Sequence, residues 1–224
     1  MSGADFEVAQ GADANVLLDC AVNAKNTRPK LFAPRVPFAE VIMKLLIAYA
    51  TNEGQTRKIA QHIADRCVDH GNAVELMGLA DANAIALSRF DAAILGGSLH
   101  TGHYQKLLSE FAADHVTALD ALPTLLVSVS LAAAGHDAEE WRGLDAILSD
   151  FQEATTWTPG QVVQVAGAYK PSDYDVFRRF IMRRIIAKKD PEADLDWDKE
   201  YTDWDALDGV VDTWLAEVAA QEPS

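Results

Sequence analysis

The chain has 224 residues and a formal net charge of −15 at neutral pH. Its length is enough for one good-sized core, and 49% hydrophobic with 24% charged residues is an ordinary globular composition, which argues against disorder. The negative charge excludes a general nucleic-acid-binding protein, because phosphate contacts need a basic face.

Cysteine content and hydropathy narrow the cellular setting. Cys20 and Cys67 are too few for a disulfide framework, which indicates a reducing compartment. No apolar run approaches the roughly 20 residues of a membrane-spanning helix, and the N-terminal residues lack the basic and apolar regions of a secretory signal. We therefore expect a soluble cytoplasmic protein that is at most attached to a membrane surface.

Residues 1–42 differ from the rest of the chain. They show no sustained hydrophobic period and contain Pro29, Pro34 and Pro37. We interpret them as a loosely ordered N-terminal extension, with a partner-binding arm as the alternative. The domain itself is expected over residues 43–220.

From residue 43 onward, short apolar runs alternate with helical periods. The run KLLIAYA, residues 44–50, is typical of a strand buried on both faces of a parallel sheet. A helix follows in which Ile59, Ile63 and Cys67 recur every four residues. The later elements are strands over 73–77, 91–96, 123–130 and 162–168, and helices over 81–88, 104–115, 138–153 and 203–220. Five strands alternating with five helices predict a doubly wound parallel α/β sheet, because parallel neighbours need crossover helices.

The loop that leaves the first strand points most directly to a function. It reads TNEGQT and consists of Thr51, Asn52, Glu53, Gly54, Gln55 and Thr56. Ligands of such sheets bind beyond the carboxyl ends of the strands. Two threonine hydroxyls, a glycine turn and the unpaired N–H groups of a helix start make an anion cradle suited to a phosphate monoester. A plain helix cap is the structural alternative.

Other nucleotide-binding motifs are absent at this position. The loop matches neither G-x-x-x-x-G-K-[ST] nor G-x-G-x-x-G, which excludes a triphosphate P-loop and a Rossmann dinucleotide site. Residues 48–50 supply no acidic cluster for an aspartate phosphorylation pocket. No metal site is expected.

The strand, loop and helix together resemble the phosphate loop of flavodoxins, [ST]-x-T-G-x-T. Glu53 replaces the second threonine, so a backbone amide has to take over one hydroxyl contact. Further motifs are GSLHTGHY at 97–104, SVSL at 128–131, AGA at 166–168 and YTDW at 201–204. Over roughly residues 43–220 this series is similar to the menaquinone-dependent protoporphyrinogen oxidases, flavodoxin-like enzymes of haem biosynthesis.

The resemblance implies a flavodoxin-like five-stranded sheet in the order 2-1-3-4-5, an insert at about 170–202, and FMN as cofactor. Besides the phosphate loop, it assigns to the flavin Gly97, Ser98, Leu99, His100, Thr101, Gly102, His103, Tyr104, Ser128, Val129, Ser130 and Leu131. The alternative for His100 is a structural role in the loop, and for His103 and Tyr104 a helix cap and core packing. The loop after the fourth strand contains no aromatic residue, so one face of the ring is expected to stay open for a substrate.

The insert contains a basic segment, FRRFIMRRIIAKK, with six positive and no negative residues. On a helix its Phe, Ile and Met residues form one apolar side, as in helices that lie on an anionic membrane surface. The resemblance to quinone-linked enzymes favours this interpretation. Two alternatives remain for the arginines Arg178, Arg179, Arg183 and Arg184: contacts to porphyrin propionates, or a solvated helix packed on the domain.

The expected function is FMN-dependent oxidation of protoporphyrinogen IX to protoporphyrin IX, with menaquinone or ubiquinone as acceptor. The expected location is the cytoplasm, with peripheral attachment to the inner face of the cell membrane. A plain flavodoxin-type carrier is the first alternative: the net charge favours it, whereas the basic segment and the missing aromatic count against it. An FMN quinone reductase and a non-enzymatic interaction module are the others. No catalytic acid or base is assigned.

Overall fold

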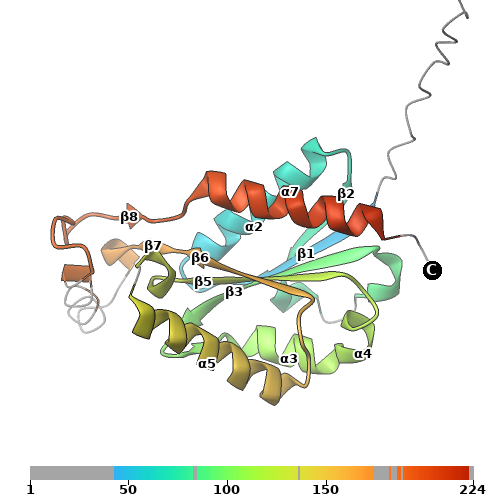
Figure 1. Cartoon of the computed structure of the whole chain (residues 1–224), viewed down its shortest axis with the longest axis horizontal. Helices are drawn as coiled ribbons and strands as arrows, with labels where there is room; N and C mark the ends of the chain where they lie inside the picture. The colour runs from blue at the N-terminus through green and yellow to red at the C-terminus, as the bar shows by residue number, and fades with distance from the viewer. Residues whose placement is uncertain are drawn as a thin grey trace, which may run out of the picture. The chain divides into compact units, whose positions relative to one another are not determined.

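Helices cover both faces of a parallel sheet in the computed structural model of the protein (Figure 1). The structure describes residues 43–82, 85–135, 137–173, 182, 186–187 and 189–221. The predicted extension at 1–42 and the arginines Arg178, Arg179, Arg183 and Arg184 lie outside the described residues.

Five parallel strands form the sheet in the order β2-β1-β3-β5-β6. They are β1 (Lys44–Ala50), β2 (Ala73–Gly78), β3 (Ala92–His100), β5 (Thr124–Ser130) and β6 (Gln161–Ala166). The short β4 (His103–Tyr104) pairs antiparallel with β3, so β5 and β6 are the fourth and fifth predicted strands. The predicted flavodoxin-like order is confirmed.

Two helical layers enclose the sheet (Figure 1). Helices α2 (Gln55–Asp69) and α7 (Trp204–Ala220) lie on one face, and α3 (Lys106–Asp114), α4 (Val116–Leu119) and α5 (Ala138–Thr155) on the other. Alternate residues of β1 enter different cores. Leu45 and Ile47 pack with α2 and α7, whereas Leu46 and Ala48 pack with α3 and α5. Burial on both faces explains why this strand is apolar after Lys44.

The helix predicted over residues 81–88 is wrong. The structure has two 3₁₀ turns instead, Leu79–Asp81 and Leu87–Arg89, with residues 83–84 outside the described part. Each turn buries one leucine, Leu79 and Leu87. Because isolated helices of this length are marginal in water, packing of these two side chains outweighs the local helical pattern.

Two predicted boundaries also change. The third helix begins at Lys106 rather than at residue 104, because Tyr104 belongs to β4. The last parallel strand ends at Ala166, and the chain then forms β7 (Ala168–Tyr169), which pairs with β8 (Lys199–Glu200) in a separate two-stranded ribbon. This ribbon brackets the insert.

The insert has a small core of its own. Tyr169 and Ile186 are almost fully buried there, against partly buried side chains from the insert and from the loop after β5. These partners are Leu131, Met182, Ala193, Leu195 and Tyr201. The insert is therefore packed against the sheet end from which that loop leaves.

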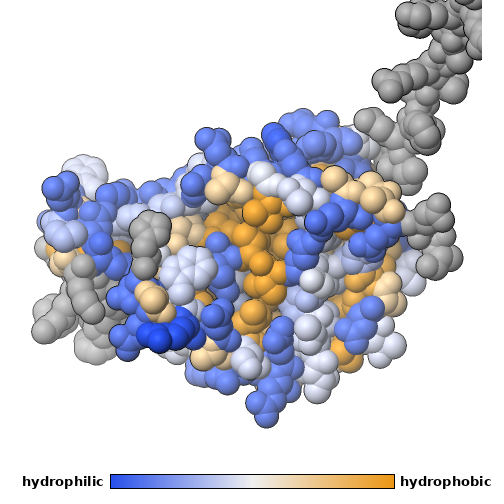
Figure 2. All heavy atoms as spheres, viewed as in Figure 1, coloured by the Kyte–Doolittle hydropathy of each residue, from blue (hydrophilic) through white to orange (hydrophobic). Residues whose placement is uncertain are grey.

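Strand β6 is an edge of the sheet. Its Val162 and Val163 are half-buried and pack against the cores on opposite faces. Figure 2 shows an apolar strip running from α7 toward α5 across this side of the molecule, with hydrophilic side chains around it. The edge strand thus remains only partly covered.

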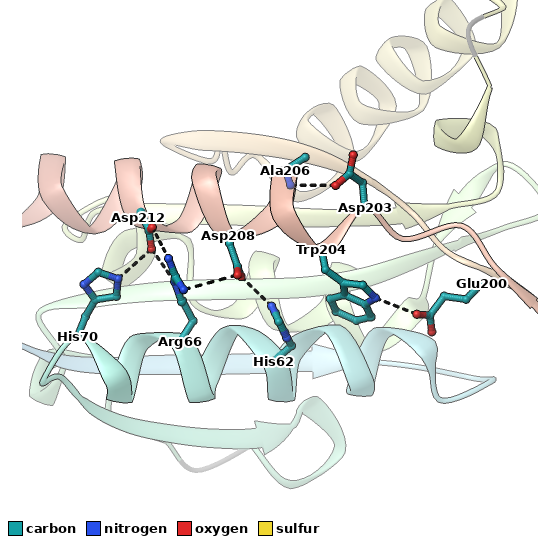
Figure 3. Close-up of polar contacts among 9 residues, drawn as sticks. All are labelled: His62, Arg66, His70, Glu200, Asp203, Trp204, Ala206, Asp208 and Asp212. Atoms are coloured by element: carbon teal, nitrogen blue, oxygen red, sulfur yellow. Dashed lines mark hydrogen bonds and ion pairs between the residues drawn. The ribbon is translucent and has the colours of Figure 1, made fainter.

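A row of polar contacts joins α2 to α7 (Figure 3). His62 Nε2 lies 2.7 Å from Asp208 Oδ1, and Arg66 donates two hydrogen bonds, of 2.8 and 2.5 Å, to the Asp212 carboxylate. His70 Nε2 lies 2.9 Å from the same carboxylate. The residues recur every four positions on each helix, so they face one another across the contact. We call this row the α2–α7 ladder.

The ladder should make stability depend on acidity. Hydrogen bonds from Arg66 are the main cause that lowers the pKa of Asp212 from 3.8 to about 2. A depressed carboxyl pKa stabilises the fold above the ordinary value, and this contribution is lost as pH falls from about 4 toward 2. We expect Asp212→Asn to lower the free energy of unfolding at neutral pH and to flatten its decline between pH 4 and 2. Urea unfolding over a pH series measures both effects.

The matched control is Asp145→Asn on α5, an exposed position that removes the same charge without touching the ladder. It should keep the pH profile of the wild type. An Asp212→Asn variant with the wild-type slope below pH 4 would contradict the assignment.

Candidate functional site

The carboxyl ends of the central strands meet at one edge of the sheet. Ala50 of β1 pairs with Gly97 of β3, which pairs in turn with Ser128 of β5. The segments that follow these positions therefore leave the sheet next to one another. In doubly wound sheets this is the edge where ligands bind.

The loop after β1 is an open turn that leads into α2. Gly54 adopts a left-handed conformation with φ of 80°, and its N–H donates a 3.0 Å hydrogen bond to Thr51 Oγ1. An added Cβ would meet nothing within 4 Å, so the backbone conformation, not lack of space, favours glycine here. No described side chain caps α2, so the N–H groups of its first turn remain available to an anion.

The other residues of this loop take different roles. Asn52 is exposed, whereas Thr56 is buried. The methyl group of Thr56 faces Gly96 of β3, so its hydroxyl is the branch that does not face this strand. The carbonyl oxygen of Glu53 accepts a 3.1 Å hydrogen bond from Lys170 Nζ. The structure thus places a positive charge beside a loop that contains no Lys or Arg in its own sequence.

The side chain of Gln55 points away from the loop and holds the insert's return strand. Its Nε2 donates 3.0 Å hydrogen bonds to Glu200 Oε2 and to Thr202 Oγ1. Thr202 in turn donates to the carbonyl oxygen of Ala166 at the end of β6. The start of α2 is therefore anchored to residues more than 100 positions away in the sequence.

The YTDW motif at 201–204 supplies this anchor through Thr202. It also starts the last helix, as the contact from Asp203 to Ala206 in Figure 3 shows. Asp203 accepts a hydrogen bond from Ala206 N and so caps α7. Trp204 Nε1 donates to Glu200 Oε1 at 2.9 Å, and Lys58 Nζ lies 2.6 Å from the other oxygen of that carboxylate. Burial alone would raise the pKa of Glu200, but the hydrogen bonds from Lys58, Gln55 and Trp204 outweigh it and lower the pKa.

The segment after the third strand is a β-hairpin rather than the predicted loop. Leu99 pairs with Tyr104 and His100 with His103. Thr101 and Gly102 form the turn, with φ values of 49° and 81°. Two central residues with positive φ are typical of two-residue hairpins, because their twist matches that of the strands. His100 is half-buried and His103 exposed near the tip, and Ser98 and Leu99 are half-buried on the way to it.

Tyr104 belongs to the core. Its hydroxyl donates a 2.9 Å hydrogen bond to Ser128 Oγ, and its ring lies 4.7 Å from that of Phe151. Burial raises its pKa, opposed by the bond to Ser128. Core packing, one of the two alternatives for this residue, therefore describes its side chain. Gly97 is buried too, and an added Cβ would clash with Leu108 Cδ2.

The segment after β5 offers its main chain to the site. Ser128 and Val129 are buried within the sheet, and Ser130 Oγ accepts a hydrogen bond from Ala133 N. The carbonyl oxygen of half-buried Leu131 accepts a 2.8 Å hydrogen bond from Lys189 Nζ. A ligand against this segment would therefore meet backbone atoms and Leu131 rather than the three preceding side chains.

The sequence motifs do not predict the contacts that Lys170 and Lys189 make with the loops at this edge. Both lysines lie far from those motifs in the sequence. Their position in the sequence could have indicated these contacts. Both lysines flank the apolar part of the insert, and the two ends of the insert have to lie at the carboxyl edge of the sheet. Their contacts depend on packing that no local pattern encodes.

The described part of the chain offers no residues for a reactive thiol, a metal site or a membrane-spanning helix. Burial raises the pKa of the Cys67 thiol to about 12, so it stays protonated and unreactive. Within residues 43–221, as far as they are described, no group of three or more His, Cys, Asp or Glu side chains could hold a metal ion. None of the described helices combines the length and the apolar character needed to cross a membrane.

Comparisons with known proteins agree with this architecture. Residues 46–196 match the family described as Flavodoxin domain. A protein named protoporphyrinogen IX dehydrogenase [quinone] from Escherichia coli (strain K12) is 28% identical over 165 residues, which cover 74% of this chain and 91% of that protein. A protein of the same name from Leishmania major is 27% identical over 165 residues, covering 73% and 71%.

Solved structures with a similar arrangement include a flavodoxin from the domain Archaea, with 13% identity and a TM-score of 0.42 over 79% of this chain and 99% of that one. Oxidised flavodoxin 1 from Bacillus cereus has 16% identity and a TM-score of 0.39, covering 67% and 99%. The family match spans well over half of the chain, and it confirms both the predicted resemblance and FMN as the cofactor. This chain belongs to the flavodoxin domain family and is an FMN-type oxidoreductase.

Proposed function

We propose that this protein oxidises protoporphyrinogen IX to protoporphyrin IX in haem biosynthesis and passes the electrons through FMN to a membrane quinone. The observation that carries the flavin chemistry is the open anion cradle at residues 51–56. Substrate and acceptor are supported by the names of the relatives from E. coli and L. major. The conversion removes six hydrogens from protoporphyrinogen IX in three two-electron steps, and each step reduces one quinone to a quinol.

The residues at this edge fit FMN, which combines a phosphate monoester with a flat ring. The phosphate would be held by Thr51, Asn52, Glu53, Gly54, Gln55 and Thr56, through hydroxyls and first-turn N–H groups. Because Thr51 Oγ1 accepts from Gly54 N, its own proton is left to donate to a phosphate oxygen. When bound, FMN supplies the redox chemistry, accepting electrons from a reduced substrate and releasing them to the acceptor.

The ring would lie between the β3–β4 hairpin, residues 97–104, and the segment 128–131. The hairpin is fixed by its strand pairing and by the bond from Tyr104 to Ser128. The second segment is fixed by Lys189. Both walls are thus held by contacts that need no cofactor, which is the preorganisation expected of a binding site.

A soluble electron carrier is the second candidate. The net charge of −15 favours it, because carriers dock on basic partners through complementary charge. A carrier would be reduced and oxidised by proteins and would leave porphyrinogen unchanged, so a direct assay separates the two.

The phosphate cradle gives a first prediction. Replacing both Thr51 and Thr56 by Ala removes two hydroxyl bonds to a charged acceptor, each worth roughly 1.5–3 kcal/mol, so FMN affinity should fall by about two to four orders of magnitude. Fluorescence titration of the apoprotein measures it. The control Thr213→Ala removes a hydroxyl that bonds to Gly209 O on α7, and it should bind FMN normally. Unchanged affinity in the double variant would contradict the cradle assignment.

The activity is tested anaerobically with FMN-loaded protein, protoporphyrinogen IX and either menaquinone or ubiquinone. Porphyrin fluorescence should appear together with quinol. Without quinone, at most one porphyrin should form for every three flavins, because the conversion releases six electrons and each FMN accepts two. The Thr51→Ala, Thr56→Ala protein should produce less porphyrin than the wild type, in proportion to its lower flavin content. Flavin that is reduced by a reductase but never by porphyrinogen would favour the carrier.

We further propose that the basic segment attaches the protein to anionic membrane. Each Lys or Arg near such a surface contributes about 1 kcal/mol, and a Debye length of about 8 Å limits the opposing effect of distant carboxylates. We expect salt-sensitive binding to phosphatidylglycerol vesicles that is lost when Arg178, Arg179, Arg183 and Arg184 become Glu, as measured by flotation. Vesicles of neutral lipid are the control.

The same variant separates a lipid role from a porphyrin role. If the arginines meet lipid, turnover with quinone in membranes should fall while turnover with a soluble dye acceptor persists. Loss of both activities at unchanged FMN content would instead assign the arginines to the porphyrin. Wild-type protein that ignores anionic vesicles at low salt would rule out the attachment.

A further inference from the structure

Two lysines that flank the apolar part of the insert each contact one loop of the flavin site. Lys170 follows β7 directly, and its Nζ lies 3.1 Å from the carbonyl oxygen of Glu53 in the phosphate loop. Lys189 stands near the other end of the segment, and its Nζ donates to the carbonyl oxygens of Leu131 and Ala132. The insert therefore contacts the site both at the loop expected to hold the phosphate and at the segment expected to lie against the ring.

Lys170 brings its charge next to the cradle. Glu53 immediately precedes Gly54, at the point where the loop turns into α2, and Lys170 is half-buried there. The two basic residues of the first turns of α2 are placed differently. Lys58 pairs with Glu200 and lies over the Trp204 ring, and Arg57 is exposed to solvent. Solvent screens a partly buried cation less than a fully exposed one such as Arg57.

Lys189 holds the backbone of the segment after β5 through its ammonium group. Its Nζ donates hydrogen bonds to Leu131 O at 2.8 Å and Ala132 O at 3.1 Å, and it forms an ion pair with Glu140 Oε2 at 2.5 Å. Its side chain is only 13% exposed, so these contacts replace water almost completely. They connect the insert, the segment after β5 and α5 through one buried charge. The position of the Leu131 backbone thus depends on Lys189.

We propose that the insert is a structural part of the cofactor site, in which Lys170 attracts the flavin phosphate and Lys189 positions the segment after β5 against the ring. This rests on FMN occupying the cradle at 51–56. Lys170 is a binding residue for the phosphate, whereas Lys189 is a positioning residue that acts through the Leu131 and Ala132 backbone. The two roles predict different responses to the two halves of the cofactor.

Comparison of FMN with riboflavin separates the two roles, because riboflavin has the same ring but no phosphate. Lys170→Met should weaken FMN binding about ten- to a hundredfold, as expected for losing a partly screened charge near a dianion, and leave riboflavin binding within about twofold. Lys170→Arg should keep most of the FMN affinity. In the wild type, rising salt should weaken FMN more than riboflavin, and this difference should shrink in Lys170→Met.

Lys189→Met should weaken FMN and riboflavin by the same factor, about ten- to a hundredfold, because the ring is common to both. It should also shift the visible absorption of the bound flavin, a response that loss of stability alone does not produce. Lys189→Arg keeps the charge and should restore part of the affinity and the spectrum. Thermal unfolding of the apoproteins shows which variants are folded, and Lys189→Arg serves as the test if Lys189→Met is not.

The matched control is Lys199→Met. This lysine belongs to the same insert and pairs with Asp190, but it contacts neither flavin loop in the described structure. Its removal changes the net charge equally and should leave both affinities unchanged.

Three results would overturn the proposal: equal loss of FMN and riboflavin in Lys170→Met, wild-type affinities and spectrum in the Lys189 variants, or the same losses in Lys199→Met. Wild-type protein that binds neither flavin would contradict the FMN assignment itself, so the two failures are distinguishable.

Discussion

The parallel register of β1, β3 and β5 is the constraint on which the site depends. Ala50, Gly97 and Ser128 lie in one row across the three strands, so every segment that follows them begins at the same edge. The sheet is held by burial on both faces, and β1 has no charged residue after Lys44, with which it begins. A shift of one residue between β1 and β3 would turn the core residues of β1 toward the wrong layer and move the cradle away from the hairpin. Packing of the core and placement of the site are therefore the same requirement.

Contacts from distant parts of the chain complete what this register begins. Gln55 binds Thr202, and Lys170 binds the Glu53 carbonyl, so the start of α2 is held by residues at both ends of the insert. The small core around Tyr169 and Ile186 stabilises the insert in this position. The loop after β1 is thus part of a larger arrangement. The insert at 170–202 contacts this loop and the segment after β5, and so supports both.

Local patterns predict the parts of this structure that local physics decides. The run at 44–50 has to be a doubly buried strand, and the TNEGQT loop has to turn at Gly54, where the observed φ of 80° favours glycine. The errors occur where packing outweighs pattern. Near residues 81–88, burial of Leu79 and Leu87 in two separate 3₁₀ turns replaces the predicted helix. HTGH becomes a hairpin turn because Thr101 joins Gly102 at positive φ. The lysine contacts join positions 58 and 117 residues apart, a separation at which neither composition nor periodicity carries information.

The α2–α7 ladder also has a consequence for how the chain is made. His62 and Asp208 are 146 positions apart, so α2 leaves the ribosome long before its partner helix has been synthesised. During that interval its polar row faces water, and Gln55 lacks Thr202, so the nascent cradle is without its support. Contacts of such long sequence separation form late in folding, because loop closure has to be completed before they contribute. We therefore expect stable flavin binding only once the chain has been synthesised as far as Thr202 and α7.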